Sequence, residues 1–368
     1  MKKIKIETLT PVHIGSGREL MRDVEFLTMP SDGEDVFVVI DEEKVFNIVG
    51  EENISAWVNI IETKGDLKSY LKQRKPNLKA SEIAKREILI FIDDDFSKNK
   101  SLKEQLHDGR GKRYIPGSSL KGAIRTAVLS QKVLQNTDLA KNNKTDFKQQ
   151  FSAKGIESKL FGNNPNEDVF RFLQISDVYF DYQTIALKAE IFNRLESGWS
   201  FKESGSQLIE AIPNEAESYF TLKIDKAQLK LNNSRYETDF LTEKELFRLI
   251  NEHTKALLEK EIEFWHDEKL KDAITGDAYM EKLNELLETV NECTEKEAVL
   301  RVGFGSGWDF ITGGWAKNED VMNDYDYDKF LNQVRKQAKY DDSVPFPKSR
   351  KISSSADIFG FVKLIMEE

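Results

Sequence analysis

Polar and apolar residues alternate at the start of the chain. Residues 2–8 read Lys-Lys-Ile-Lys-Ile-Glu-Thr, which has the period of two that is typical of a half-buried strand. Two further apolar runs enclose Ser31-Asp32-Gly33, a good turn signal. The predicted strands are residues 2–8, 24–29, 36–40, 88–92, 172–180, 185–192, 219–224 and 360–366.

Apolar positions three and four residues apart predict helices between these strands. Ser118 or Ser119 can cap the N-terminus of one helix, whose apolar stripe is Leu120, Ile124 and Val128. The other predicted helices are a short one after Asp41, one over residues 57–71 that ends before Pro76, and two charged amphipathic ones over residues 246–265 and 279–290, joined by Thr275-Gly276-Asp277.

The order of these elements bears on fold class. Strands and helices are mixed without regular alternation, which favours an α+β fold with antiparallel sheets over a doubly wound parallel sheet. A strand followed by Gly-x-Gly occurs near each end of the chain, which is a weak sign of an internal repeat. A chain of 368 residues is long enough for two domains or one large composite domain.

Composition narrows the classes of protein. No window approaches the ~18 consecutive apolar residues that a membrane span needs. The N-terminus reads as a strand and not as a signal peptide, and a single cysteine, Cys293, excludes an intramolecular disulfide and a cysteine-based zinc site. We therefore expect a cytoplasmic protein with no membrane association.

Charge is unevenly distributed. The net charge of −10 argues against a generic nucleic-acid coat. Residues 96–162, however, contain 14 Lys/Arg and 5 Asp/Glu, whereas residues 243–297 contain 8 Lys/Arg and 16 Asp/Glu. The first region can meet phosphate, while the second faces water or a basic partner; both are also compatible with ordinary solvated helix faces.

Three glycine-rich segments are the main candidates for chemistry: His13-Ile-Gly-Ser-Gly17, Pro116-Gly-Ser-Ser-Leu-Lys-Gly122 and Gly303-Phe-Gly-Ser-Gly307. Glycine lets a backbone approach a phosphate closely, and a helix N-terminus presents free N–H groups to an anion. Each segment alone is compatible with an ordinary turn, but the three together favour an anionic ligand. Trp308 and Tyr114 are candidates for stacking on unpaired bases or for core packing.

Enzyme interpretations fit less well. Gly117 and Gly122 have phosphate-loop spacing, but Ala123-Ile124 stand where Lys and Ser/Thr are required. The pairs His107-Asp108 and His266-Asp267 lack further ligands for a metal, and Asp93-Asp94-Asp95 is more typical of a solvated strand end. We expect no metal and no cofactor. His13 with Lys121 remains an alternative for metal-free RNA cleavage.

The same segments resemble a known family. Thr10-Pro-Val-His-Ile-Gly-Ser-Gly17, Ile115-Pro-Gly-Ser-Ser-Leu-Lys-Gly-Ala-Ile-Arg125, Phe172-Leu-Gln-Ile-Ser-Asp-Val178 and Arg301-Val-Gly-Phe-Gly-Ser-Gly-Trp308 are similar to the successive signatures of RAMP proteins. Within that superfamily, chain length and motif order best resemble the fifth-subunit family of type III-A CRISPR Csm effector complexes.

The resemblance implies a ferredoxin-like (RRM-like) core, duplicated in degenerate form, with helical insertions. Residues 1–182 would form an N-terminal RRM-like domain with a basic insertion. Residues 183–368 would form a C-terminal RAMP-like domain with an acidic helical insertion at about 241–297. The resemblance also implies that the protein is a subunit that holds the 3′ part of the guide RNA (crRNA) in antiviral defence. It implies further that this subunit supports maturation of the guide RNA. The implied partners are the backbone and small subunits of the complex and a host nuclease that trims the guide.

The family also implies a non-catalytic role. In the related backbone subunit an aspartate on a loop cuts target RNA, and Asp23 is the nearest candidate here. Two alternatives remain: a metal-independent endoribonuclease that processes guide precursors, and a protein–protein scaffold working through residues 243–297. The expected RNA-binding residues are His13, Gly15, Ser16, Gly17, Arg18, Lys112, Arg113, Ser118, Ser119, Lys121, Arg125, Gly303, Gly305, Gly307, Trp308, Lys348, Arg350 and Lys351.

Overall fold

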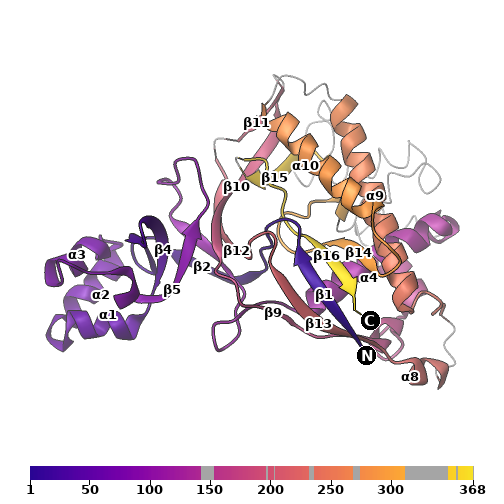
Figure 1. The fold of residues 1–368 in the computed structure, drawn as a ribbon, viewed down its shortest axis with the longest axis horizontal. Coiled ribbons are helices and arrows are strands. Elements are labelled where there is room, and N and C mark those ends of the chain that lie inside the picture. Colours follow the sequence, from indigo (N-terminus) through magenta and orange to yellow (C-terminus); the bar gives the residue numbers. More distant parts are fainter. Residues whose placement is uncertain are drawn as a thin grey trace.

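Two β-sheets joined near the middle of the molecule form the framework, with a small helical lobe at one end and longer helices at the other (Figure 1). The structure is a computed structural model. It describes residues 1–141, 153–195, 198–202, 204–231, 236–267, 274–310, 347–353 and 355–367.

The first sheet contains both ends of the described chain. Its strand order is β14-β16-β1-β13-β8, and every neighbouring pair is antiparallel. The strands are β1 (Lys2–Thr8), β8 (Leu173–Ile175), β13 (Glu217–Ile224), β14 (Glu297–Arg301) and β16 (Phe361–Met366). In β1 the alternation seen in the sequence has its expected consequence, because Ile4 and Ile6 are fully buried while Lys3 is exposed.

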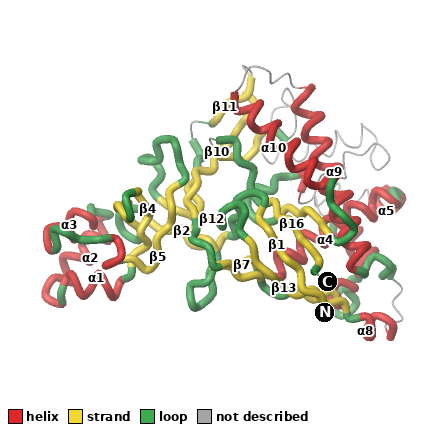
Figure 2. Tube along the Cα trace, viewed as in Figure 1, coloured by secondary structure: helices red, strands yellow, loops and turns green. Residues whose placement is uncertain are grey.

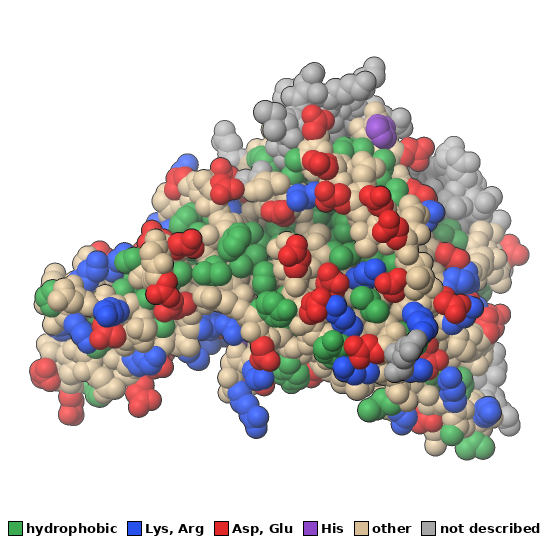
Figure 3. Space-filling view, viewed as in Figure 1, with side chains coloured by type: hydrophobic (Ala, Val, Ile, Leu, Met, Phe, Trp, Pro, Cys, Tyr) green, Lys and Arg blue, Asp and Glu red, His purple; other side chains and the backbone are tan. Residues whose placement is uncertain are grey.

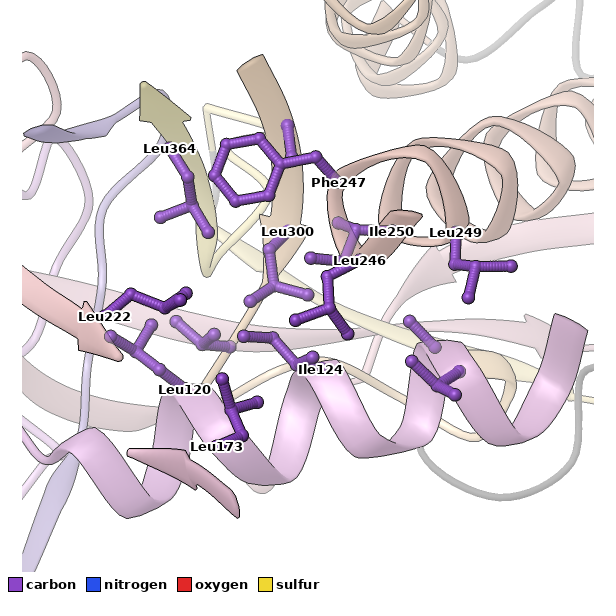
Figure 4. Packing of buried hydrophobic residues seen from close by; sticks show 14 of the residues in the cluster. Leu120, Ile124, Leu173, Leu222, Leu246, Phe247, Leu249, Ile250, Leu300 and Leu364 are labelled. Carbon is purple, nitrogen blue, oxygen red and sulfur yellow. The ribbon is translucent and has the colours of Figure 1, made fainter. Parts of the chain in front are cut away.

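Two helices, α4 (Gly117–Gln135) and α9 (Glu243–Asp267), bury their apolar stripes against this sheet. Figure 4 shows Leu120 and Ile124 of α4 close to Leu246 and Ile250 of α9, with strand residues completing the cluster. All four side chains are fully buried. Burial of a leucine or isoleucine side chain contributes about 1.5–3 kcal/mol, so this cluster is a major source of stability.

The arrangement is ferredoxin-like. In sequence, β1, α4, β8, β13, α9 and β16 follow a βαββαβ order, and their strands lie in the spatial order 4-1-3-2. The strand β14 extends this sheet beyond β16. The ferredoxin-like core expected from the family is therefore confirmed. A second, degenerate copy stays a prediction.

The second sheet is larger and curls around a core of its own. Its order is β2-β6-β12-β10-β5-β4-β3, and β11 and β15 also pair with β10. A buried cluster that includes Leu20, Phe37, Leu102 and Leu208 draws residues from seven of these strands. The strands are β2 (Gly15–Met21), β3 (Phe26–Ser31), β4 (Glu34–Ile40), β5 (Ala84–Ile90), β6 (Ser101–Gln105), β10 (Ile185–Leu195), β11 (Gly198–Phe201), β12 (Gln207–Ala211) and β15 (Ser349–Ser353).

The remaining elements are shorter or peripheral. Three helices form a lobe on β3 and β4 at one end of the molecule (Figure 2). They are α1 (Glu42–Val49), α2 (Ile54–Thr63) and α3 (Leu67–Arg74). The others are the ribbon β7 (Arg113–Ile115) with β9 (Val178–Phe180), and the helices α5 (Asp138–Lys141), α7 (Lys154–Phe161), α8 (Lys226–Leu231) and α10 (Ile274–Asn291), besides the 3₁₀ turns at Glu51–Asn53, Ala80–Glu82 and Val169–Phe172.

Several local predictions were wrong. Residues 57–71 do not form one helix, because Lys64 turns into the left-handed region and Asp66 caps a new helix. Residues 172–180 form two short strands, not one. Thr275-Gly276-Asp277 lies within α10 and does not join two helices. Gly15, Ser16 and Gly17 do not form a separate turn but begin the strand β2, which pairs with β6 through an irregular register.

The expected division at residue 182 stays a prediction. The first sheet combines β1 and β8 with β13, β14 and β16, and the second also takes strands from both sides of that position. The acidic helix α9 is a covering element of the first sheet, since Leu246, Phe247 and Leu258 lie in buried clusters. Its polar side carries surface ion pairs such as Arg248 with Glu245.

Candidate nucleic-acid interface

The first and third glycine segments meet where the two sheets join. The Phe304 N–H donates to the His13 carbonyl over 3.0 Å, and the Gly360 N–H donates to the Pro11 carbonyl over 2.9 Å. Gly303 has φ +75°, and a Cβ there would lie 2.5 Å from the His13 carbonyl oxygen. Glycine is therefore required at position 303 for packing within the protein. We call the surface formed by residues 13–18 and 303–307 the glycine junction.

His13 is a packing residue of this junction. Its side chain is 2% exposed, and Nδ1 lies 2.6 Å from the Glu210 carbonyl oxygen. The ring meets Phe304 edge-on at 5.5 Å. Burial lowers the pKa of His13, which favours the neutral imidazole. This geometry counts against His13 as a general acid or base acting on an RNA strand.

Accessible groups of the junction come from both segments, and Gly303 and Gly307 of the third segment are exposed. Gly15, Gly17 and Arg18 are exposed, and Ser16 is half-buried. Gly17 has φ +87°, and no described residue lies within 4 Å of the position that a Cβ would occupy. The backbone at residues 15–18 is therefore open to a ligand, whereas Gly303, although exposed, packs against the His13 carbonyl.

Cationic side chains border the glycine junction. The Lys351 ammonium lies 4.5 Å from the centre of the Phe304 ring. Burial and the nearby charge of Lys103 lower the pKa of Lys351. Arg18 is 64% exposed and pairs with Glu25 over 3.2 Å, an ion pair that solvent screens strongly. An anion placed here would relieve the repulsion between the two lysines.

The second glycine-rich segment, residues 116–122, forms the start of α4, but the helix is not capped by a serine as the sequence predicted. Neither Ser118 nor Ser119 caps the helix; Pro116 occupies the N-cap position, with no side-chain cap. Instead, Asp177 Oδ1 accepts a 2.8 Å hydrogen bond from the Gly117 N–H. A carboxylate thus already occupies the positive end of the helix, which disfavours a phosphate at the same place. The Gly117 position itself is crowded, since a Cβ would lie 2.2 Å from the Ile175 carbonyl oxygen.

Arg125 is committed to internal contacts. Its guanidinium donates to Glu157 Oε2 over 3.1 Å and to both carboxylate oxygens of Asp168 over 3.0 and 2.9 Å. It also lies over the rings of Phe161 and Phe170. By contrast, Lys121 and Ser118 line an open groove beside α7, together with Arg171. Burial lowers the pKa of Lys121.

The basic loop before β7 lies between these regions. Lys112 is about half-exposed and pairs with Asp181 over 3.1 Å. Arg113 is half-buried, and its Nε has no hydrogen-bond partner among the residues that the structure describes. Tyr114 stacks on Tyr179, with ring centres 5.3 Å apart, and Tyr179 is 41% exposed. The loop therefore offers cations and an aromatic pair at the surface.

Residues 348–351 and Trp308 lie on the far side of the third glycine segment. Arg350 forms a two-pronged ion pair with Glu261, at 2.5 and 2.8 Å, and both side chains are largely buried. Trp308 packs partly against the main core and is neither fully exposed nor fully buried. Lys348 lines the same cavity as these residues.

A buried polar cluster beneath the junction was missed by sequence reasoning. Glu210 on β12 has no exposed surface, and Arg86 on β5 donates to both of its carboxylate oxygens over 3.0 and 2.9 Å. Thr184 Oγ1 donates to it over 2.8 Å, and the Gln105 N–H over 3.2 Å. These residues come from four distant segments, so no spacing in the sequence reveals the cluster.

His107 lies 3.6 Å from the same carboxylate of Glu210. Burial by itself would raise the pKa of Glu210, but His107 and the Arg86 guanidinium outweigh it and hold that pKa at about 2. His107 is thus part of a structural cluster and is not paired with Asp108 in a metal site. Within the described ranges, no group of three His, Cys, Asp or Glu side chains is placed to hold a metal ion, and no helix is long and apolar enough to cross a membrane.

The surface as a whole is not strongly basic. On the face shown in Figure 3, acidic and basic side chains are interspersed. With a net charge of −10, any contact with nucleic acid must therefore be local. The glycine junction and the neighbouring α4 groove are the places where accessible backbone and cations coincide.

The fold and these loops define a class: a ferredoxin-like α+β protein with glycine-rich segments at the junction of two sheets. The sequence model of the RAMP superfamily matches residues 5–310, and the chain belongs to that superfamily. The resemblance seen in its motifs is thereby confirmed.

Individual relatives point to one branch. The chain is 24% identical over 325 residues to CRISPR system Cms protein Csm5 of Methanocaldococcus jannaschii, covering 83% of this chain and 71% of that protein. It is 27% identical over 152 residues to the Csm5 protein of Enterococcus italicus, covering 34% and 42% of the two chains.

Two solved structures share the fold. A chain of a Csm–crRNA–target RNA ternary complex from a type III-A CRISPR-Cas system matches over 100% of both chains, with a TM-score of 0.74 and 21% identity. The crystal structure of Csm5 from T. onnurineus matches over 97% of this chain and 99% of that one, with a TM-score of 0.67 and 18% identity.

Proposed function

We propose that this protein is a non-catalytic subunit of a type III-A Csm effector complex that holds the 3′ part of the guide RNA. The observation that carries the proposal is the glycine junction, where exposed backbone at residues 15–18 lies beside Arg18, Lys103 and Lys351. Backbone N–H groups, serines and cations hold RNA without reading its bases, which suits a guide of variable sequence.

The relatives support the same assignment. The ternary complex that contains a chain of this fold includes crRNA and target RNA, and the sequence relatives are Csm5 proteins. In our proposal the other subunits of such a complex are the protein partners. A host trimming nuclease as a further partner stays a prediction.

The proposed contacts are narrower than the set expected from the sequence. His13, Arg125 and Arg350 are buried or committed to carboxylates, and we assign them to the fold. The proposed RNA contacts of the exposed surface are Gly15, Ser16, Gly17, Arg18, Lys112, Arg113, Ser118, Ser119, Lys121 and Lys351. Gly305, Gly307, Trp308 and Lys348 line a cavity beside this surface. The Csm5 relatives and the burial of His13 favour RNA binding over the endoribonuclease and scaffold alternatives.

Replacing Arg18 or Lys351 by alanine should weaken RNA binding with little change in melting temperature. Each loss should affect single-stranded RNAs of different sequence equally and should lower the slope of log K against log salt by about 0.7 per lost phosphate contact. Fluorescence anisotropy with labelled RNAs at several salt concentrations measures both quantities.

Lys244→Ala is the matched control, because Lys244 is 72% exposed and pairs with Glu295 near the acidic helices. It should leave affinity unchanged. A loss confined to particular RNA sequences, or unchanged binding in both junction variants, contradicts the proposal. The same labelled RNAs, run on a denaturing gel with divalent metal, should remain intact. Cleavage that disappears in Asp23→Ala would show that the subunit is catalytic.

A further inference from the structure

A cavity of about 430 Å³ lies behind the third glycine segment. Its walls come from α9, α10, β14 and β16, and from the segment that leads into β15. The volume is within the range of roughly 300–1,000 Å³ that is usual for small-molecule sites. Its aromatic lining residues are Phe264, Tyr279, Trp308, Phe310 and Phe361.

Arg301 places a positive charge on the wall of this cavity. Its Nε donates to the Phe359 carbonyl and its terminal nitrogen to the Gly305 carbonyl, each over 3.0 Å. The guanidinium lies 4.7 Å from the centre of the Phe310 ring and 4.8 Å from that of Phe361. Within the described part of the chain, Arg301 forms no ion pair with a carboxylate.

Burial lowers the pKa of Arg301 to about 10, so the side chain stays charged at neutral pH. Arg301 is half-buried, and among the described residues its direct contacts are two carbonyl groups and two ring faces, with Glu261 as a more distant negative charge. An anionic ligand would add the direct ion pair that these contacts do not provide.

The two carboxylates among the described wall residues are each paired with another cation, although Glu261 also favours the charged form of Arg301. Glu261 is paired with Arg350, and Asp309 is paired with Lys260 over 3.1 Å. Lys351 also lines the cavity, so among the described wall residues the cationic side chains outnumber the acidic ones. A ligand that fits would be an anion with a flat, apolar part.

We propose that this cavity binds one nucleotide, with its phosphate on Arg301 and its base against the aromatic walls beside Trp308. The source of the nucleotide is single-stranded RNA, an inference that rests on the proposed function. The cavity opens onto Gly305, Ser306 and Gly307, which belong to the glycine junction, so one unstacked nucleotide of a bound strand can turn into it. Stacking on an aromatic side chain contributes about 1–3 kcal/mol per base.

Tryptophan fluorescence of the full chain tests the cavity. Adenosine 5′-monophosphate should quench emission in a saturable way, and the quench should be lost in Trp308→Phe, which keeps an aromatic ring but removes the reporter. Adenosine without phosphate and ribose 5-phosphate without a base should each bind at least tenfold more weakly, since each lacks one of the two recognised parts. Equal binding of ribose 5-phosphate, or no quench by the monophosphate, overturns the proposal.

Asp309→Asn provides a gain-of-affinity test that does not remove buried packing. The change deletes one negative charge from the cavity wall, so affinity for the monophosphate should rise about fivefold. Glu295→Gln is the control, because it removes a surface acid paired with Lys244 and should change nothing. An unchanged or lower affinity in Asp309→Asn contradicts a phosphate site here.

Competition separates the two sources of nucleotide. If a short single-stranded RNA quenches Trp308 and displaces the monophosphate, the strand occupies the cavity as proposed. If the monophosphate binds but RNA does not displace it, a free nucleotide is the ligand and the RNA source is wrong. RNA that binds in anisotropy without any effect on Trp308 leaves the proposed function intact and overturns only this inference.

Discussion

Arg86→Met is expected to lower the free energy of unfolding by about 3–5 kcal/mol, because it leaves the Glu210 carboxylate buried without its cation. Glu210 is fully buried and Arg86 is 12% exposed, so water cannot replace the lost partner. The loss should also loosen the glycine junction, since the Glu210 carbonyl holds His13. Urea unfolding followed by circular dichroism measures the change.

Two controls make this result specific. Lys75→Met breaks a surface ion pair with Glu82, whose side chains are 44% and 33% exposed, and should cost less than about 1 kcal/mol. The double variant Arg86→Met with Glu210→Leu removes both charges and should recover part of the loss. A single variant no more damaging than Lys75→Met would show that the buried pair contributes little.

The Glu210 carboxylate should make the free energy of unfolding depend on pH in the acid range. Its pKa is about 2 in the folded chain, below the usual value of 4.5 that applies once the chain is unfolded. The contribution of Glu210 is therefore fully present above about pH 4.5 and is lost as the pH falls toward 2. In Glu210→Gln this part of the acid dependence should disappear. An identical pH profile for both proteins between pH 5 and 2 contradicts the assignment.

Gly303→Ala should destabilise the protein by about 2–4 kcal/mol, from strain at a positive φ and from overpacking. The added Cβ would meet the His13 carbonyl oxygen at 2.5 Å and Ile14 Cδ1 at 2.7 Å. Because the first of these contacts is backbone, no side-chain rotation relieves it. Melting temperature and RNA affinity should fall together, since the contact of Gly303 with His13 holds the third glycine segment against the first.

Gly122→Ala is the matched control for this change. Gly122 lies in α4, and no atom of the described chain is within 4 Å of the position of an added Cβ, so alanine should stabilise the helix by about 0.5–1 kcal/mol. Gly17→Ala separates packing from binding, because position 17 is open but has a positive φ. Weaker RNA binding with only a small stability loss is expected there. Unchanged stability in Gly303→Ala would mean that the two glycine segments are not packed as described.

Parts of the candidate site could be anticipated from the sequence. The three glycine segments stand out locally, and two of them do meet at one surface. The roles of individual cations could not be anticipated, because a positive charge in a sequence does not name its partner. Arg125 and Arg350 have carboxylates from residues 32 or more positions away, whereas Arg18 and Lys351 remain accessible. The cap on α4 was mispredicted for the same reason: Asp177 replaces the serines from 60 residues away.

By itself the sequence determined those helices and strands in which apolar residues recur with a strong period. The alternation in residues 2–8, the stripe of Leu120, Ile124 and Val128, and the apolar face of α9 each bury the side chains that their spacing indicated. Side-chain periodicity is a property of neighbouring residues, and the hydrophobic effect acts on it wherever the chain folds. The family motifs are local in the same sense.

Only the tertiary structure decided which distant segments meet. Strand order and register decide whether β16 pairs with β1, whether Gly303 contacts His13, and whether Glu210 forms an ion pair with Arg86. These contacts join residues more than a hundred positions apart, and their energy exists only after the chain has closed those long loops. The buried ion pair and the cavity at Arg301 therefore follow from the assembled sheets and from no pattern along the chain.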